Sequence, residues 1–245
     1  MLIGVTDSGI GGLTTLKEML RVRGGGDYIY LADTASCPYG NKSAAQIADL
    51  ARQNALALQR EGAQTVVLAC NTATACAIDL LRAEFAKITF IGTEPSINTA
   101  KIYGSRLLVL ATPLTLAQPR FARLLQGVEC TAPDCRRLAA EIEQSYPSLL
   151  TARKLLRKIL APYAHAPFDA AVLGCTHYCL LAKDVRKTLS LPVTDGNGGV
   201  ARRVRKLCGA CSSPARVRLV TTSFANYRAV RAAAKDILGE NVLLY

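Results

Sequence analysis

The sequence predicts an α/β fold with two similar halves, each built on a mostly parallel sheet. Short apolar runs recur along the 245 residues, and each is followed by a polar or Gly-rich turn and then by helical spacing. That alternation is typical of βα units around a parallel sheet. Half of the residues are hydrophobic, and a chain of this length can bury one large core or two smaller ones. Two sections also share one layout of apolar strand, cysteine and helix, namely TVVLACNTAT (65–74) and AAVLGCTHY (170–178).

The individual elements follow from the same pattern, taken in chain order. LIGVT predicts a first strand that ends at Asp7, and YIYLA predicts a second strand that ends at Asp33. Later runs of Val, Ile, Leu and Ala end at turn residues in the same way. We expect strands at 2–6, 28–32, 65–69, 89–92, 106–111, 170–174, 192–195 and 217–221. Apolar residues at helical spacing predict helices at 12–22, 42–61, 73–86, 115–126, 134–144, 148–163, 178–189 and 197–208.

The domain boundaries are marked by weak signals near 92–95 and near Arg202. We therefore expect one domain built from both ends of the chain, residues 1–93 with 204–245, and a second domain from residues 94–203. The active site should lie in the cleft between them.

Targeting and cysteine usage both predict a cytoplasmic protein. No run of 18 apolar residues is present, and the first residues lack the basic start and long apolar stretch of a signal peptide. We expect no membrane contact. The nine cysteines are an odd number spread over a mid-sized chain, so we interpret them as thiols and not as a disulfide framework.

The net charge of +12 could attract nucleic acid, an acidic membrane surface or small anions, and charge alone does not choose among them. The basic residues of 202–206 and 153–158 stand at helical spacing, which favours solvated helix faces. Few aromatic residues accompany them, so we do not expect nucleic acid as a partner. Cys208 and Cys211 have C-x-x-C spacing without a second ligand pair, so zinc or redox use is a weaker hypothesis.

Polar residues follow the predicted strands where an α/β sheet places its ligand crevice. They are Asp7-Ser8, Asp33, Cys70-Asn71-Thr72, Thr112 and Cys175-Thr176-His177. Each of the two cysteines would precede a helix, where free backbone N–H groups and the helix dipole lower the pKa of a thiol toward neutrality. A buried cysteine is more often a small hydrophobic residue, but the repeated layout favours function.

Two such thiols suit the removal of an α-proton from one face of an amino acid and the return of a proton to the other face. Asn71, Thr72 and Thr176 offer donors for a substrate carboxylate, and Asp7 could hold an ammonium group. His177 could be a capping histidine or could tune the neighbouring thiol. This chemistry needs no metal and no organic cofactor.

The glycines of DSGIGG follow the first predicted strand. The run matches neither a dinucleotide-binding fingerprint nor a P-loop. We interpret it as a tight turn that exposes backbone N–H groups to an anion.

At this level of detail the motifs resemble a known family. DSGIGGLTTLKEM, CPYGNKS, VVLACNTATA, ATPLTL, VLGCTHYCLL and TDGNGGVARRV are similar, in that order, to the motifs of glutamate racemases within the aspartate/glutamate racemase family. The resemblance covers most of the chain and is thinnest between about Arg120 and Pro167. It implies two pseudo-symmetric α/β domains with a buried site between them.

The resemblance also implies residue roles. Cys70 would act on the face of D-glutamate with help from Asp7, and Cys175 on the face of L-glutamate with help from His177. Backbone donors of the turn at 38–40 would hold the side-chain carboxylate. The implied contacts to glutamate come from Asp7, Ser8, Pro38, Tyr39, Gly40, Asn71, Thr72, Thr176 and His177, to which the strand-end position of Thr112 adds a further candidate. The product D-glutamate would feed peptidoglycan synthesis.

Some positions depart from the family pattern. Cys179 stands where a proline is usual, Cys37 precedes the PYG turn, and GNGG follows Asp195. Oxidation at Cys179 is expected to silence the enzyme reversibly. In the thin region, Glu141 is the candidate carboxylate. We expect a homodimer, although one chain carries no certain mark of an interface.

Competing hypotheses remain at this point. The two-thiol mechanism does not fix the length of the substrate side chain, so aspartate or another amino acid is an alternative to glutamate, and PYG favours glutamate. The basic faces could instead serve a nucleic-acid-binding or protein-binding role.

Overall fold

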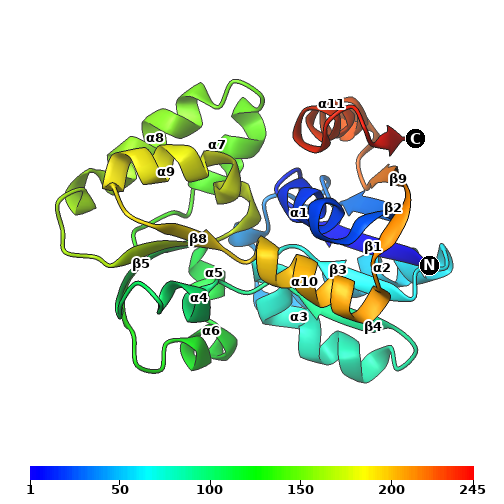
Figure 1. Cartoon of the computed structure of the whole chain (residues 1–245), viewed down its shortest axis with the longest axis horizontal. Helices are drawn as coiled ribbons and strands as arrows, with labels where there is room; N and C mark the ends of the chain where they lie inside the picture. Colours follow the sequence, from blue (N-terminus) through cyan, green and yellow to red (C-terminus); the bar gives the residue numbers. More distant parts are fainter.

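Two parallel sheets form the framework of the protein, and the computed structural model describes residues 1–245. The first sheet has strand order β10-β9-β2-β1-β3-β4 and the second has β6-β5-β7-β8. Every strand pairing in both sheets is parallel. The predicted α/β class with mostly parallel sheets is therefore confirmed. Figure 1 shows the two sheets in separate lobes, with both chain ends in the lobe of the first sheet.

The strands of the first sheet come from both ends of the chain. They are β1 (Leu2–Asp7), β2 (Gly24–Ala32), β3 (Thr65–Leu68), β4 (Thr89–Gly92), β9 (Cys211–Thr221) and β10 (Leu243–Leu244). The second sheet takes the middle of the chain, with β5 (Arg106–Ala111), β6 (Glu129–Thr131), β7 (Ala170–Gly174) and β8 (Val193–Asp195). The strand β6 was not predicted because its residues ECT form no apolar run, and β10 was not predicted because it has only two residues.

Helices cover both faces of the first sheet. On one face, α1 (Leu13–Arg23), α10 (Asn197–Cys208) and α11 (Tyr227–Leu238) share an apolar core with β1, β2 and β9. On the other face lie α2 (Ala44–Arg60) and α3 (Asn71–Glu84). The N-terminus of α2 is a capping box, because the Ser43 hydroxyl accepts from the N–H of Gln46 and the Gln46 side chain accepts from the N–H of Ser43.

The second sheet is covered in the same way. Its first face carries α7 (Leu138–Ser145), α8 (Leu150–Leu160), the 3-10 helix η3 (Thr176–Leu181) and α9 (Ala182–Leu189). Its other face carries the short helices α4 (Ile97–Ala100), α5 (Pro113–Leu116) and α6 (Pro119–Leu124). The basic residues of 202–206 and 153–158 lie on exposed or half-exposed faces of α10 and α8.

Two helix predictions are corrected. The helix predicted at 115–126 is broken into α5 and α6, because Pro119 has no N–H and begins a new helix. The helix predicted at 178–189 begins with the 3-10 turn η3, and only α9 is α-helical. The helix α11 was not predicted at all.

The domain boundaries at 93/94 and 203/204 stay a prediction. The second boundary falls inside α10, whose Val200, Ala201 and Val204 all pack in the core of the first sheet. No helix of the structure has the length and apolar composition needed to cross a membrane.

Candidate active site

Cys70 and Cys175 occupy equivalent places in the two sheets. Cys70 lies two residues after the end of β3 and is the N-cap residue of α3, while Cys175 directly follows β7 and is the N-cap residue of η3. Both thiols are buried. The repeated motif of strand, cysteine and helix therefore has a structural counterpart, with one cysteine at the carboxyl end of a central strand in each sheet.

Asp7 connects the surroundings of the two thiols. It ends β1, beside β3, and its Oδ2 accepts a hydrogen bond of 2.9 Å from the Thr176 hydroxyl, which belongs to η3. The N–H of Ser8 donates to the other carboxylate oxygen at 2.7 Å. The residue beside Cys175 is thus bonded to a carboxylate whose negative charge acts on Cys70.

The protonation of Asp7 and Cys70 is dominated by burial. Burial raises the pKa of Asp7, although His177, Thr176 and the N–H of Ser8 oppose it. Burial also raises the pKa of Cys70 well above its usual value, and the charge of Asp7 adds to the effect. The N–H groups of Ala73 and Thr72 act in the opposite direction. The expectation that the helix N-terminus lowers the pKa of this thiol is therefore wrong for Cys70, because the loss of solvation outweighs the helix dipole.

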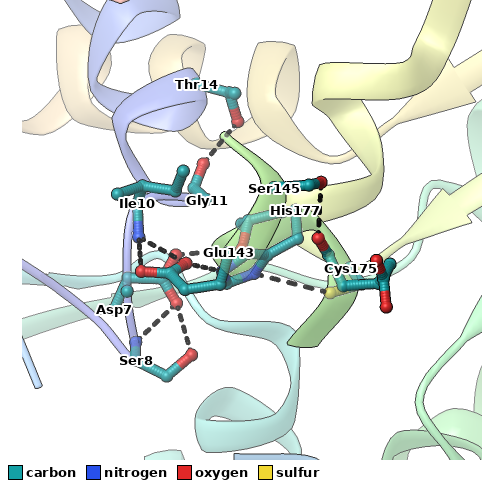
Figure 2. A network of polar contacts seen from close by, with 12 residues as sticks. Asp7, Ser8, Ile10, Gly11, Thr14, Glu143, Ser145, Cys175 and His177 are labelled. Atoms are coloured by element: carbon teal, nitrogen blue, oxygen red, sulfur yellow. Dashed lines mark hydrogen bonds and ion pairs between the residues drawn. The ribbon is translucent and has the colours of Figure 1, made fainter. Parts of the chain in front are cut away.

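Cys175 faces a histidine and, through it, a carboxylate. Its Sγ lies 4.0 Å from Nδ1 of His177, and Nε2 of the same ring lies 2.6 Å from Oε2 of Glu143. Figure 2 shows Glu143 between the backbone of Ile10 and the His177 ring, with Cys175 on the far side of the ring. Burial lowers the pKa of His177, but the contacts with Cys175 and Glu143 outweigh it and hold the pKa well above its usual value.

Glu143 is the carboxylate that the sequence reasoning missed. Burial raises its pKa, yet the bonds from His177 and from the N–H of Ile10 outweigh burial and leave the pKa lowered. The candidate Glu141 lies two residues earlier on α7, half-buried, and lines a different hollow of the surface. Residues two apart on a helix point in nearly opposite directions, so only one of them can reach His177.

The DSGIGG turn fits closely against these residues. A Cβ atom on Gly11 would lie 2.6 Å from both Nδ1 of His177 and Oγ1 of Thr176. Only glycine leaves room there for η3. The N–H of Ile10 donates to both oxygens of Glu143, at 3.3 and 3.1 Å. The anion at this turn is therefore a side chain of the protein itself.

Three threonines meet between the sheets, and two of them were predicted site residues. The hydroxyl of Thr72, at the start of α3, lies 3.0 Å from that of Thr112 and 3.2 Å from that of Thr115. Thr115 was not predicted, because its hydroxyl reaches the cluster only through the turn that Pro113 begins. Asn71 donates to the backbone oxygen of Thr93 at 3.4 Å.

The 38–40 turn lies beside this cluster. Gly40 has Thr112 as its nearest side chain, with Cγ2 3.8 Å from the position of an added Cβ atom. The hydroxyl of Tyr39 donates to Asp33 at 2.7 Å and accepts from Asn54 at 3.2 Å, so it is occupied inside the protein. Pro38 lines a cavity of about 800 Å³ together with Cys37, Ile10 and Glu143.

Cys179 is placed behind Cys175. Its Sγ lies 3.7 Å from the backbone oxygen of Cys175, and burial raises the pKa of its thiol well above the usual value. The effect of oxidation at Cys179 stays a prediction.

Comparison with known proteins agrees with the fold and the motifs. The family model described as Asp/Glu/Hydantoin racemase matches residues 6–204. The chain therefore belongs to the Asp/Glu/Hydantoin racemase family, and the resemblance found in the motifs is confirmed.

The chain is similar, within this family, to proteins that are named as glutamate racemases. The glutamate racemase of Aliarcobacter butzleri is 37% identical over 218 residues, which are 84% of each chain. The crystal structure of a glutamate racemase isoform from Bacillus anthracis superposes with a TM-score of 0.86 at 25% identity, covering 100% of this chain and 96% of the other. The glutamate racemase of Francisella tularensis, solved in complex with D-glutamate, has a TM-score of 0.81 at 26% identity and covers 99% and 95%.

Proposed function

We propose that this protein interconverts L- and D-glutamate without a cofactor, using Cys70 and Cys175 as the two acid/base groups. The observation that carries the proposal is the hydrogen bond between Asp7 and Thr176, because it joins the surroundings of two thiols that belong to different sheets. The family and the D-glutamate complex of the Francisella tularensis relative support the substrate. Glutamate is preferred over aspartate on these grounds.

The two thiols differ in the charges around them, and this difference assigns one thiol as the acid and the other as the base. A protonated His177, held by Glu143, stabilises a negative charge on the Cys175 sulfur. Cys70 is buried beside the Asp7 carboxylate and favours the neutral thiol. For the reaction that starts from L-glutamate, we therefore assign the acid to Cys70 and the base to the thiol beside the His177 cation.

The proton balance follows from these states. With L-glutamate bound, the Cys175 thiolate removes the α-proton, the Cα–H bond breaks and its electron pair passes to the adjacent carboxylate. The Cys70 thiol then delivers its proton to the opposite face, which forms the new Cα–H bond and leaves Cys70 as the thiolate. The reverse reaction starts from the exchanged protonation states.

The remaining site residues are proposed to bind the substrate. Thr72, Thr112 and Asn71 offer donors for a carboxylate, and the 38–40 turn offers backbone donors beside Thr112. We assign Asp7 to the α-ammonium group, and Ser8, Thr176 and His177 to further contacts with the bound substrate. Supply of D-glutamate for peptidoglycan, a cytoplasmic location and a homodimer are proposed from the family resemblance.

The test is racemisation and α-proton exchange of L- and D-glutamate in deuterated water, without added cofactor. We expect the parent to place solvent deuterium in the inverted product, and Cys70→Ser and Cys175→Ser to lose racemisation. The matched control is Cys76→Ser, which changes a half-buried thiol on α3 and should keep activity.

The outcomes separate the alternatives. Activity with aspartate and not with glutamate would correct the substrate alone. A parent inert with both would remove the racemase proposal and leave the binding hypotheses for the basic faces. Racemisation that survives either cysteine replacement would contradict the two-base mechanism.

A further inference from the structure

A group of three side chains that can bind metal ions lies at the edge of the proposed active site. The thiol of Cys37, the ring of His177 and the carboxylate of Glu143 each offer one ligand atom, and these atoms lie within 4.8 Å of one another. They come from three separate segments, namely the loop before the 38–40 turn, η3 and α7. Neither Cys37 nor Glu143 is needed to take or give the α-proton in the mechanism above.

We propose that Cys37, Glu143 and His177 form an inhibitory site for a divalent cation of the zinc class. Zinc takes sulfur, nitrogen and oxygen ligands at about 2.0–2.3 Å in a tetrahedron, which sets its ligand atoms about 3.3–3.8 Å apart. The three side chains therefore need to shift by no more than about 1 Å to surround one ion. A water molecule or an anion would complete the tetrahedron.

The donor set selects the type of ion. Calcium and magnesium require mainly oxygen ligands, and this group offers only one carboxylate. One thiolate, one imidazole and one carboxylate suit zinc and its close analogues cobalt and cadmium.

The cavity beside the group gives an ion a way in. Cys37 and Glu143 both line the cavity of about 800 Å³, whose other walls come from α7 and α11. His177 lies behind them and is 3% exposed. An ion that enters from this side reaches the group without passing between Cys70 and Cys175.

Binding of an ion would remove the charged His177–Glu143 pair that supports Cys175. The Nε2–H group of His177 donates to the Glu143 carboxylate at 2.6 Å, a separation too short to hold an ion between the two atoms. Insertion of the ion therefore breaks this bond and removes the proton from Nε2. The ring can then no longer act as a cation beside the Cys175 sulfur. The inhibition rests on the proposed function, whereas the metal binding does not.

Cobalt binding tests the site independently of activity. Chelator-treated enzyme is titrated with Co²⁺, and the thiolate-to-cobalt charge-transfer absorption is followed for the parent, Cys37→Ser and the control Cys130→Ser. Cys130 is another half-buried thiol, on the edge strand β6 of the second sheet, and it is not one of the three proposed ligands. We expect one equivalent of cobalt to give the band in the parent and in Cys130→Ser, and the band to be lost in Cys37→Ser.

Inhibition by Zn²⁺ is measured on the same three proteins, with Mg²⁺ as the control ion. We expect Cys37→Ser to need about 100-fold more Zn²⁺ than the parent for half-inhibition, because one of the few strong ligands is gone. Equal inhibition of parent and Cys37→Ser, or a cobalt band that survives in Cys37→Ser, would overturn the proposal and assign the ion to Cys70, Cys175 or another thiol. If Cys37→Ser is inactive, the cobalt titration alone decides.

Discussion

Glu143 and His177 form an ion pair at the back of the Cys175 thiol, with 2.6 Å between Oε2 and Nε2. The pKa of Glu143 is lowered and that of His177 is raised, so both shifts favour the charged pair. Because His177 is buried and Glu143 is also fixed by the N–H of Ile10, the ring orientation toward Cys175 is set by a contact from a different helix.

Replacement of Glu143 by Gln should lower kcat/KM for glutamate by roughly 100-fold, because His177 loses the anion that keeps it protonated. The matched control is Glu141→Gln on the same helix, which should keep normal activity. Glu143 acts through His177 and is a positioning residue, so its test includes the pH profile of kcat/KM. The part of the pH profile that reports the loss of the His177 proton should move to lower pH in Glu143→Gln, because the pKa of His177 falls without the carboxylate. An unchanged pH profile with reduced activity would mean that Glu143 only supports the fold.

The stability of the pair should depend on pH in a defined window. The contribution of His177 is fully present below its unfolded pKa of 6.5 and is lost as the pH rises through its raised folded value. The contribution of Glu143 is present above its unfolded pKa of 4.5 and is lost as the pH falls through its lowered folded value. Urea unfolding should therefore show the largest gap between parent and Glu143→Gln between pH 4.5 and 6.5, about 1 to 3 kcal/mol. A gap that widens as the pH is raised above this window would contradict the assignment.

Asp7→Asn should raise the stability of the protein at neutral pH while it abolishes racemisation. The pKa of Asp7 is raised by burial, so its contribution to stability is greatest when the carboxyl is protonated and declines as the pH rises through the folded value. An amide keeps an acceptor for the N–H of Ser8 and carries no charge. We expect a higher Tm, by about 2 to 4 °C for each kcal/mol, with the gain disappearing toward pH 3.8. The exposed control Asp49→Asn should change Tm little; a lower Tm for Asp7→Asn would refute the burial argument.

Tyr39→Phe should cost stability more than substrate affinity. The Tyr39 hydroxyl bonds to Asp33 and Asn54, both buried, so its loss leaves polar groups unpaired at a cost of about 1 to 3 kcal/mol. Thermal unfolding gives the first quantity and the KM for glutamate gives the second. A large rise in KM at unchanged Tm would show that the side chain, and not only the turn backbone, contacts the substrate.

The sequence was sufficient for the parts of the fold that rest on long apolar runs. The inner strands β1, β3, β5 and β7 are rich in Val, Ile, Leu and Ala, and their carboxyl ends were predicted to within one residue of the observed ends. The edge strands β6 and β10 were missed because pairing with the neighbouring strand, and not local residue preference, holds their two or three residues extended.

Glu143 could not be found from spacing alone. It lies on α7, in the stretch where the motifs are least distinctive, and it acts on His177 from 34 residues away in the chain. Nothing in a helix with two nearby glutamates indicates which one faces a partner, because that depends on how α7 packs against η3.

The two cysteines end equivalent strands, yet their neighbours differ, with Asp7 on one side and the Glu143–His177 pair on the other. L- and D-glutamate have the same free energy in water, so the Haldane relation makes kcat/KM equal in the two directions whatever the residues are. The unequal neighbours can therefore change the ratio of the two kcat values only together with the ratio of the two KM values. A variant of His177 or Asp7 that slows one direction more than the other at saturating substrate must also lower KM in that direction, relative to the other direction, by the same factor.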